Sequence, residues 1–240
     1  MSSYGRLAPS YDRLRPVDEN WWEVFEALVE QGDLAGRRVL DVGCGTGVLA
    51  AALAERGSRV WGVDASEEML AQAAARAGLA VAFKQGVAED LAFKDRWFER
   101  LVFRLVVHVV DRQRAFAEAR RVLAADGRVV IATFDPAHFD HYWLNELFPK
   151  VKEIDRERFP GEQELAAELS AAGFASSRVT RISQIGRLTR DEAMERIQGR
   201  FISTLALLDD DTYDAGLSRA ERELPDLIES PLEWLVIAAE

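Results

Sequence analysis

The residues with the clearest chemical meaning in this sequence are an aspartate and three glycines that follow it at alternate positions. They lie in residues 39–47, Val-Leu-Asp-Val-Gly-Cys-Gly-Thr-Gly, so the acid is Asp41 and the glycines are Gly43, Gly45 and Gly47. Glycine has no Cβ, so the backbone can turn sharply and approach a ligand closely. A carboxylate here favours a cationic ligand group and repels a pyrophosphate. The pattern predicts a ligand-binding turn; the alternative is a tight turn that binds nothing.

The residues on either side of this turn predict the elements that hold it. Residues 37–42 are apolar and rich in β-branched side chains, which predicts a buried strand, and residues 48–56 predict an apolar helix that Gly57 ends. A strand, a glycine turn and a helix in this order place a nucleotide-like ligand at the carboxyl edge of a parallel sheet.

A second acid, Asp64, ends the next predicted strand, residues 59–64. In a parallel sheet this acid lies beside the glycine turn, where a carboxylate accepts hydrogen bonds from both hydroxyls of a ribose. Ser66 then predicts an N-cap for a helix that continues over residues 69–76. The alternative role for Asp64 is an acid that leads this helix without binding a ligand.

Strands and helices alternate as far as residue 134, which predicts a doubly wound α/β fold around a parallel sheet. Before them, one apolar stripe predicts an N-terminal helix that ends at Gly32. The predicted elements are strands over 37–42, 59–64, 80–84, 98–107, 128–134, 177–184 and 234–238, helices over 48–56, 69–76, 115–123 and 162–172, an irregular aromatic stretch over 135–160, and a polar helical insertion over 189–227.

The insertion carries Phe201, Leu205 and Leu208 at spacings of four and three, which predicts one apolar helical face laid on the domain. An excursion of this length in a compact domain usually has a functional role or a role in assembly. We expect a lid over a binding pocket; the alternatives are a contact between two copies of the chain and an inert surface decoration.

Composition limits the function classes. The chain has 240 residues and a net charge of −11, so its average field repels nucleic acid. A single cysteine, Cys44, excludes an intramolecular disulfide and a thiolate metal cluster, and the three histidines make a metal site improbable. No apolar run is long enough to span a membrane and the N-terminus lacks a signal-peptide core, so we expect a cytoplasmic protein.

The ordered motifs resemble those of the class I S-adenosylmethionine-dependent methyltransferases, in particular the small-molecule type 11/25 group. The glycine turn matches motif I, residues 86–93 match the loop after the third strand, and residues 98–108 and 119–127 match the next two segments. The resemblance covers roughly residues 11–134 and continues more weakly over 164–174. It implies a seven-stranded Rossmann-like sheet whose last strand is antiparallel and inserted beside strand five, with helical additions.

The resemblance also implies an organisation and a cofactor. Residues 1–240 form one domain, with 1–32 as an N-terminal helical cap, 33–135 as the cofactor-binding core, and 136–160 and 187–230 as substrate-side insertions. The cofactor is S-adenosyl-L-methionine, whose sulfonium and amino groups suit an acid at the turn. The residues expected to bind it are Tyr11, Asp41, Gly43, Cys44, Gly45, Gly47, Asp64, Ala65, Met69, Val87, Ala88, Glu89, Phe103 and Arg104.

Two of these positions, Val87 and Tyr11, carry open alternatives, and Phe103 departs from the family pattern. Val87 stands where the family usually has an acid or amide, so the adenine amino group is met either by Glu89 or by backbone alone. Phe103 replaces a small residue, and it and Arg104 are expected to pass the methionine end by their backbone. Tyr11 either faces the sulfonium through a cation–π contact or packs in the core.

The expected reaction is in-line methyl transfer to a small-molecule acceptor, which chiefly needs positioning and desolvation. His108 is the candidate catalytic base, and its alternative role is packing within the scaffold. His138, His141, Tyr142 and Trp143 follow the fifth strand and either line an acceptor pocket or form a packed surface loop. Partners are expected to be a small molecule and, in one alternative, a second copy.

Two rival functions remain open from sequence. One is a protein that binds S-adenosylmethionine or S-adenosylhomocysteine without catalysis, which the few candidate bases leave open. The other is an NAD-dependent oxidoreductase, which the glycine spacing and Asp41 disfavour.

Overall fold

The computed structural model describes residues 7–240, and its centre is one mixed sheet of seven strands in the order β3-β2-β1-β4-β5-β7-β6. The first five strands run parallel to one another, and β7 runs antiparallel to both β5 and β6. The doubly wound sheet with an antiparallel last strand beside strand five is therefore confirmed. The strands are β1 (Arg38–Val42), β2 (Arg59–Asp64), β3 (Val81–Gln85), β4 (Phe98–Arg104), β5 (Leu123–Phe134), β6 (Ser177–Thr189) and β7 (Leu227–Ala239).

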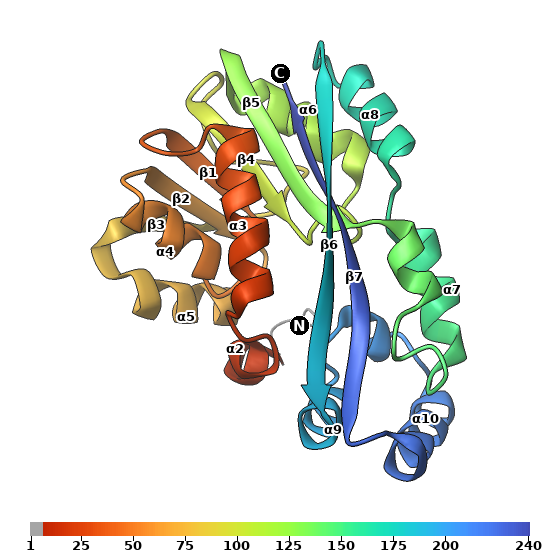
Figure 1. Cartoon of the computed structure of the whole chain (residues 1–240). Coiled ribbons are helices and arrows are strands. Elements are labelled where there is room, and N and C mark those ends of the chain that lie inside the picture. The colour runs from red at the N-terminus through yellow and green to blue at the C-terminus, as the bar shows by residue number, and fades with distance from the viewer. Residues whose placement is uncertain (1–6) are drawn as a thin grey trace.

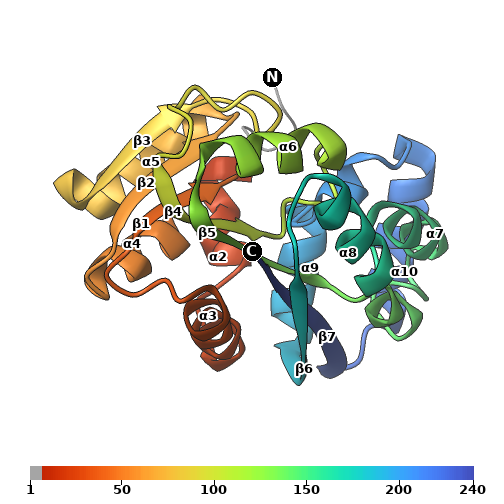
Figure 2. The ribbon, with the colours of Figure 1, turned by 90° about the horizontal axis from the view of Figure 1, so that it is seen from above.

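Helices cover both faces of the sheet because successive strand residues point to opposite sides. Val39 of β1 packs in a core beneath α3 (Glu19–Gly32) and α4 (Val48–Glu55). Its neighbour Leu40 packs in the opposite core, beneath α6 (Arg112–Val122) and α8 (Glu162–Ala171). Figure 2 shows α3 and α6 on opposite sides of the sheet. A further helix, α5 (Glu67–Ala77), flanks β3 near the edge.

Side-chain caps and one backbone reversal set element ends that differ from the prediction. Ser66 accepts from the Met69 amide at 3.3 Å, which confirms it as the N-cap of α5. Asp111 caps α6, so that helix begins at Arg112 and not at residue 115. The predicted strand over 98–107 is too long, because β4 ends at Arg104 and Leu105 has a left-handed φ of 53°.

The final two strands are longer than predicted and form a ribbon that reaches far beyond the rest of the sheet (Figure 1). The final strand was expected over 234–238, whereas β7 pairs with β6 from Leu227 onward. Cross-strand pairing along the whole ribbon stabilises this extension. Because the paired residues are distant in sequence, the local residue pattern did not predict it.

A separate hydrophobic core lies around the far half of this ribbon. It unites the segment after β5 with the insertion between β6 and β7, for example Phe148 with Ile197 and Leu205. We call these elements the distal lobe: η3 (Pro136–Asp140), α7 (Pro149–Arg158), α9 (Arg190–Gln198), η4 (Ser203–Ala206) and α10 (Asp210–Glu223). The stretch over 135–160, predicted as irregular, thus contains a short 3₁₀ helix and α7.

The predicted apolar helical face of the insertion is wrong in form. Phe201, Leu205 and Leu208 are all buried in the distal lobe, but they lie in η4 and its flanking loops and not on one helix. The N-terminal segment, η1 (Ala8–Ser10) and α2 (Tyr11–Leu14), reaches the same lobe, because Leu14 packs in its core. Among residues 7–240, no helix is both long and apolar enough to cross a membrane.

Candidate active site

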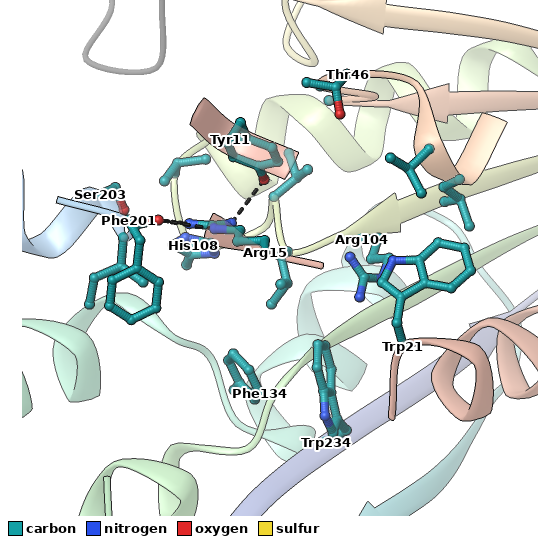
Figure 3. Close-up of a pocket in the computed structure, with 18 of the residues that line it drawn as sticks. Tyr11, Arg15, Trp21, Thr46, Arg104, His108, Phe134, Phe201, Ser203 and Trp234 are labelled. Atoms are coloured by element: carbon teal, nitrogen blue, oxygen red, sulfur yellow. Dashed lines mark hydrogen bonds between the residues drawn. The ribbon is translucent and has the colours of Figure 1, made fainter. Parts of the chain in front are cut away.

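A cavity of about 560 Å³ lies between the carboxyl ends of the central strands and the distal lobe (Figure 3). Asp41, Asp64 and Arg104 line it from the ends of β1, β2 and β4. Tyr142 and Phe201 line it from the distal lobe, so one continuous space joins the glycine turn to the lobe.

The three glycines of the turn differ in what surrounds them. All have positive φ, at 71°, 53° and 74° for Gly43, Gly45 and Gly47. A Cβ on Gly43 would lie 2.4 Å from a methyl of Val106, and one on Gly47 would lie 2.8 Å from Ala73. A Cβ on Gly45 would meet nothing within 4 Å. Gly43 and Gly47 therefore allow close packing of the scaffold, whereas Gly45 leaves its space to the cavity.

Asp64 is held against this turn by two backbone amides. Its Oδ2 accepts from the Gly45 amide at 2.9 Å and its Oδ1 accepts from the Ser66 amide at 2.9 Å. A carboxylate has about four lone-pair sites, so two remain for other donors. This geometry fits a ribose whose two hydroxyls donate to one acid.

Asp41 is a buried acid with an incompletely hydrogen-bonded carboxylate. The residue is 1% exposed, and its Oδ2 has no hydrogen-bond partner among the described residues. Burial, and then the nearby Asp64 carboxylate, raise the pKa of Asp41 to about 7, while Arg104 acts in the opposite direction. A cationic ligand group beside this oxygen would provide a partner for it. The sulfonium and amino groups of S-adenosylmethionine are cationic groups of this kind.

Arg104 supplies a cation close to this acid. Its guanidinium lies near two indoles, 5.4 Å from the ring of Trp21 and 5.5 Å from that of Trp234 (Figure 3). Its Nε has no partner among residues 7–240, and burial lowers the pKa of Arg104 to about 10, so the side chain stays charged at neutral pH. Because guanidinium pairs well with carboxylate, Asp41 and Arg104 together fit an amino acid end.

The side chain of Arg104 was not anticipated as a ligand group, since only its backbone was expected at the cofactor. The side chain of Phe103 points to the other face of the sheet. It does not line the cavity, and its ring packs in the core with its centroid 5.9 Å from that of Phe116. Strand alternation explains both orientations, because neighbouring residues of β4 face opposite sides.

The other expected cofactor residues lie around the same half of the cavity, with one exception. Gly47 packs against α5 and does not line it. The Glu89 carboxylate accepts from the Asp111 amide at 2.8 Å, which fixes the loop after β3. Those that line the cavity are Tyr11, Asp41, Gly43, Cys44, Gly45, Asp64, Ala65, Met69, Val87, Ala88, Glu89 and Arg104.

Tyr11 lies between the cavity and a small hydrophobic cluster of the N-terminal segment. It lines the cavity and also packs against a small cluster with Leu7 and Met69. Its hydroxyl accepts from Arg15 at 2.8 Å, and the Arg15 guanidinium also donates to the Phe201 carbonyl, with Nε at 3.0 Å. Arg15 thus ties the N-terminal segment to the distal lobe (Figure 3), a role for which its sequence context carried no signal.

His108 lies on the lobe side of the cavity, stacked on Phe159 with ring centroids 4.0 Å apart. Burial, then the positive charges of Arg158 and Arg15, lower the pKa of His108 to about 3. The imidazole is therefore neutral at physiological pH, and its Nδ1 has no partner among the described residues. Such a group is a weak base but a good hydrogen-bond acceptor.

The residues after β5 divide between the cavity and the surface. His138, Tyr142 and Trp143 line the cavity, whereas His141 is exposed and does not. Within residues 7–240, no group of three His, Cys, Asp or Glu side chains is placed to hold a metal ion.

Known proteins resemble this chain in sequence over about half of its length. Residues 40–131 match the family model described as a methyltransferase domain. The chain is 33% identical over 132 residues to the ubiquinone biosynthesis O-methyltransferase of Pseudomonas syringae, covering 53% of this chain and 54% of that protein. It therefore spans about half the length of the curated relatives that it matches.

Solved structures extend the likeness over nearly the whole fold. A candidate methyltransferase from an antibiotic biosynthesis pathway of Anabaena variabilis is 25% identical and superposes with a TM-score of 0.72, covering 91% of this chain and 97% of that one. Phosphoethanolamine N-methyltransferase 2 of Haemonchus contortus, bound to S-adenosylhomocysteine, is 22% identical with a TM-score of 0.61, covering 97% of this chain and 56% of that one. The latter shares the fold.

Residues 40–131 therefore match a methyltransferase domain, and nearly the whole chain shares its fold with solved methyltransferases. Both findings agree with the resemblance to the class I S-adenosylmethionine-dependent methyltransferases.

Proposed function

We propose that this protein transfers the methyl group of S-adenosylmethionine to a small-molecule acceptor. The observation that carries the proposal is the single cavity that joins the glycine turn and two acids to an aromatic wall on the distal lobe. Ligand sites are typically apolar with a few convergent polar groups, and this cavity combines an aromatic wall with two acids.

In the proposed reaction an acceptor lone pair forms a bond to the methyl carbon as the carbon–sulfur bond breaks, and the sulfur retains that electron pair. An acceptor that carries a proton on the attacking atom then loses it. The chain's own residues orient the reactants and exclude water, which is most of what such a displacement needs. His108, neutral and unpartnered, accepts a hydrogen bond that orients the acceptor.

The proposed cofactor contacts follow from the cavity geometry. Asp64 binds the ribose, Asp41 faces the cationic groups, Arg104 pairs with the carboxylate, and residues 87–89 border the adenine. We assign residues 33–135 to the cofactor-binding core, 1–32 to an N-terminal cap, and 136–160 and 187–230 to substrate-side insertions. The protein acts in the cytoplasm on a free small molecule.

Transfer of radiolabelled methyl tests the proposal. Purified protein is incubated with labelled S-adenosylmethionine and a metabolite extract, and labelled products are separated from the cofactor. The expected result is labelled product that disappears when S-adenosylhomocysteine is added in excess. Tight cofactor binding without any transfer across extracts would contradict the proposal.

A second candidate is a protein that binds the cofactor without transferring its methyl group. One observation favours it: burial lowers the pKa of His108 to about 3, so the candidate base that lines the cavity is only weakly basic. The labelling experiment separates the two functions, and sizing of the purified chain tests whether the distal lobe forms a homodimer contact.

A further inference from the structure

The lobe side of the cavity is built from flat rings. His108 and Phe159 stack at 4.0 Å with 12° between their planes, and Phe134 stacks on His138 at 4.3 Å. The ring of Trp234 also lies 4.2 Å from that of Phe134, between centroids. All five side chains line the cavity. Planar walls favour a planar guest, because aromatic rings gain most when they stack or meet edge to face.

The charge on this side of the cavity is positive. Arg15 and Arg196 line it, and the charges of Arg15 and Arg158 act on His108 in the direction that lowers its pKa, after the larger effect of burial. The lining acid of the distal lobe is Asp155, which already accepts from the Thr204 hydroxyl and lies 3.7 Å from Arg158. A cationic amine would be repelled here, whereas an anion would be attracted.

Arg196 of α9 is the cation best placed to bind such an anion. It lines the cavity, and its guanidinium carbon lies 5.8 Å above the ring of Phe201. Across the described part of the chain it donates no side-chain hydrogen bond and forms no ion pair, although the charges of Glu192 and Asp18 act on it. Arg15, in contrast, donates to Tyr11 and Phe201. A half-buried guanidinium with free donors is suited to a carboxylate, which it binds through two parallel hydrogen bonds.

A hydroxyl group on the guest also has partners. Ser203 accepts from Arg158 at 3.1 Å and lines the cavity, so its own O–H is available to donate. His108 offers an acceptor nitrogen on the same side of the cavity (Figure 3). A guest hydroxyl can therefore donate to His108 and accept from Ser203.

We infer that the acceptor is a flat aromatic carboxylate with a ring hydroxyl, and that Arg196 pairs with its carboxylate. This inference rests on the proposed methyl transfer. In that reaction the hydroxyl oxygen forms the bond to the methyl carbon, the carbon–sulfur bond breaks with its electrons kept by sulfur, and the hydroxyl proton passes to water.

Three probes with one ring pattern but different charge test the inference: a dihydroxybenzoate, its carboxamide and the corresponding dihydroxybenzylamine. Binding is measured calorimetrically to protein saturated with S-adenosylhomocysteine. We expect the carboxylate to bind roughly tenfold to a hundredfold more tightly than the amide, since one charge-assisted pair is lost, and the amine to bind most weakly.

Variants at Arg196 locate the effect. Arg196→Gln should remove most of the preference for carboxylate over amide, and Arg196→Lys should restore part of it. Arg187→Gln is the matched control, because Arg187 also lines the cavity but is exposed and already pairs with Glu229 at 2.8 Å. S-adenosylhomocysteine affinity and the melting temperature of each variant establish that it is folded.

Several outcomes would overturn the inference while leaving methyl transfer intact. They are tighter binding of the amine than of the carboxylate, an unchanged preference in folded Arg196→Gln, and no binding of any probe by protein that binds S-adenosylhomocysteine. Failure to bind S-adenosylhomocysteine at all would instead reject the proposed function.

Discussion

At the scale of single residues, Asp41 ties cofactor binding to pH. In the ligand-free protein its raised pKa of about 7 means that it takes up a proton as the pH falls from 8 to 6. The ammonium group of S-adenosylhomocysteine needs the ionised form. We therefore expect its dissociation constant to rise roughly tenfold per pH unit below the pKa of Asp41, measured by calorimetry.

Asp41→Asn serves as the control for this dependence. The variant should bind more weakly at pH 8 but show a flat profile between pH 8 and 6, because the titrating group is gone. A variant profile as steep as that of the parent would assign the dependence to another residue.

Gly45 allows a second test at this scale, because strain and ligand space can be separated. Its φ of 53° disfavours any side chain, by roughly 1–2 kcal/mol, but a Cβ there meets no protein atom. Gly45→Val should stay folded and lose S-adenosylhomocysteine binding. Gly36→Val is the matched control, since Gly36 has a φ of 73°, equally open space and no place in the cavity lining. Normal binding by Gly45→Val would make the turn purely structural.

At the scale of elements, the distal lobe closes the cavity through its contact with α2. Arg15 links them by hydrogen bonds to Phe201 and Tyr11, and Leu14 packs in the core of the lobe. Deletion of the insertion would uncover Phe148 and Val151, which pack in the same core, so a single substitution is the cleaner probe of closure.

We expect Arg15→Gln to raise the acceptor KM by roughly tenfold and to speed hydrogen exchange in α2, because the hydrogen bonds from the Arg15 guanidinium to the Phe201 carbonyl of the lobe are lost. Arg13→Gln is the comparison variant. Arg13 also reaches the lobe, through an exposed ion pair with Glu195, and exposed pairs contribute little. Equal effects of the two variants would argue against Arg15 as the tether.

At the scale of the whole molecule, a bound cofactor stabilises the fold by mass action. S-adenosylhomocysteine at about a hundred times its dissociation constant should add about 2.7 kcal/mol, or roughly 5–10 °C in melting temperature for a chain of this size. Asp64→Ala should reduce the shift at the same concentration, because the ribose loses its acceptor. NADH should produce no shift, since Asp41 opposes a pyrophosphate; stabilisation by NADH would favour the oxidoreductase alternative.

The sequence by itself determined the cofactor half of this protein. Strand, glycine turn and helix around Gly45 are local patterns with periods of two and 3.6 residues, and Asp41 and Asp64 are placed by the ends of their own strands. The sheet order followed from the same alternation together with the family resemblance. These features depend on short stretches of chain, so they can be predicted from the sequence without a structure.

Only the tertiary structure decided the acceptor half. The contacts of Arg104 with Trp21 and Trp234 join three distant segments, and the distal lobe joins α7 to α9 and α10 through one core. The weak basicity of His108 likewise comes from burial and from arginines far away in the chain. The burial of a side chain and the electrostatic field that acts on it depend on all of its neighbours in space. The spacing of residues in the sequence does not show which residues those neighbours are.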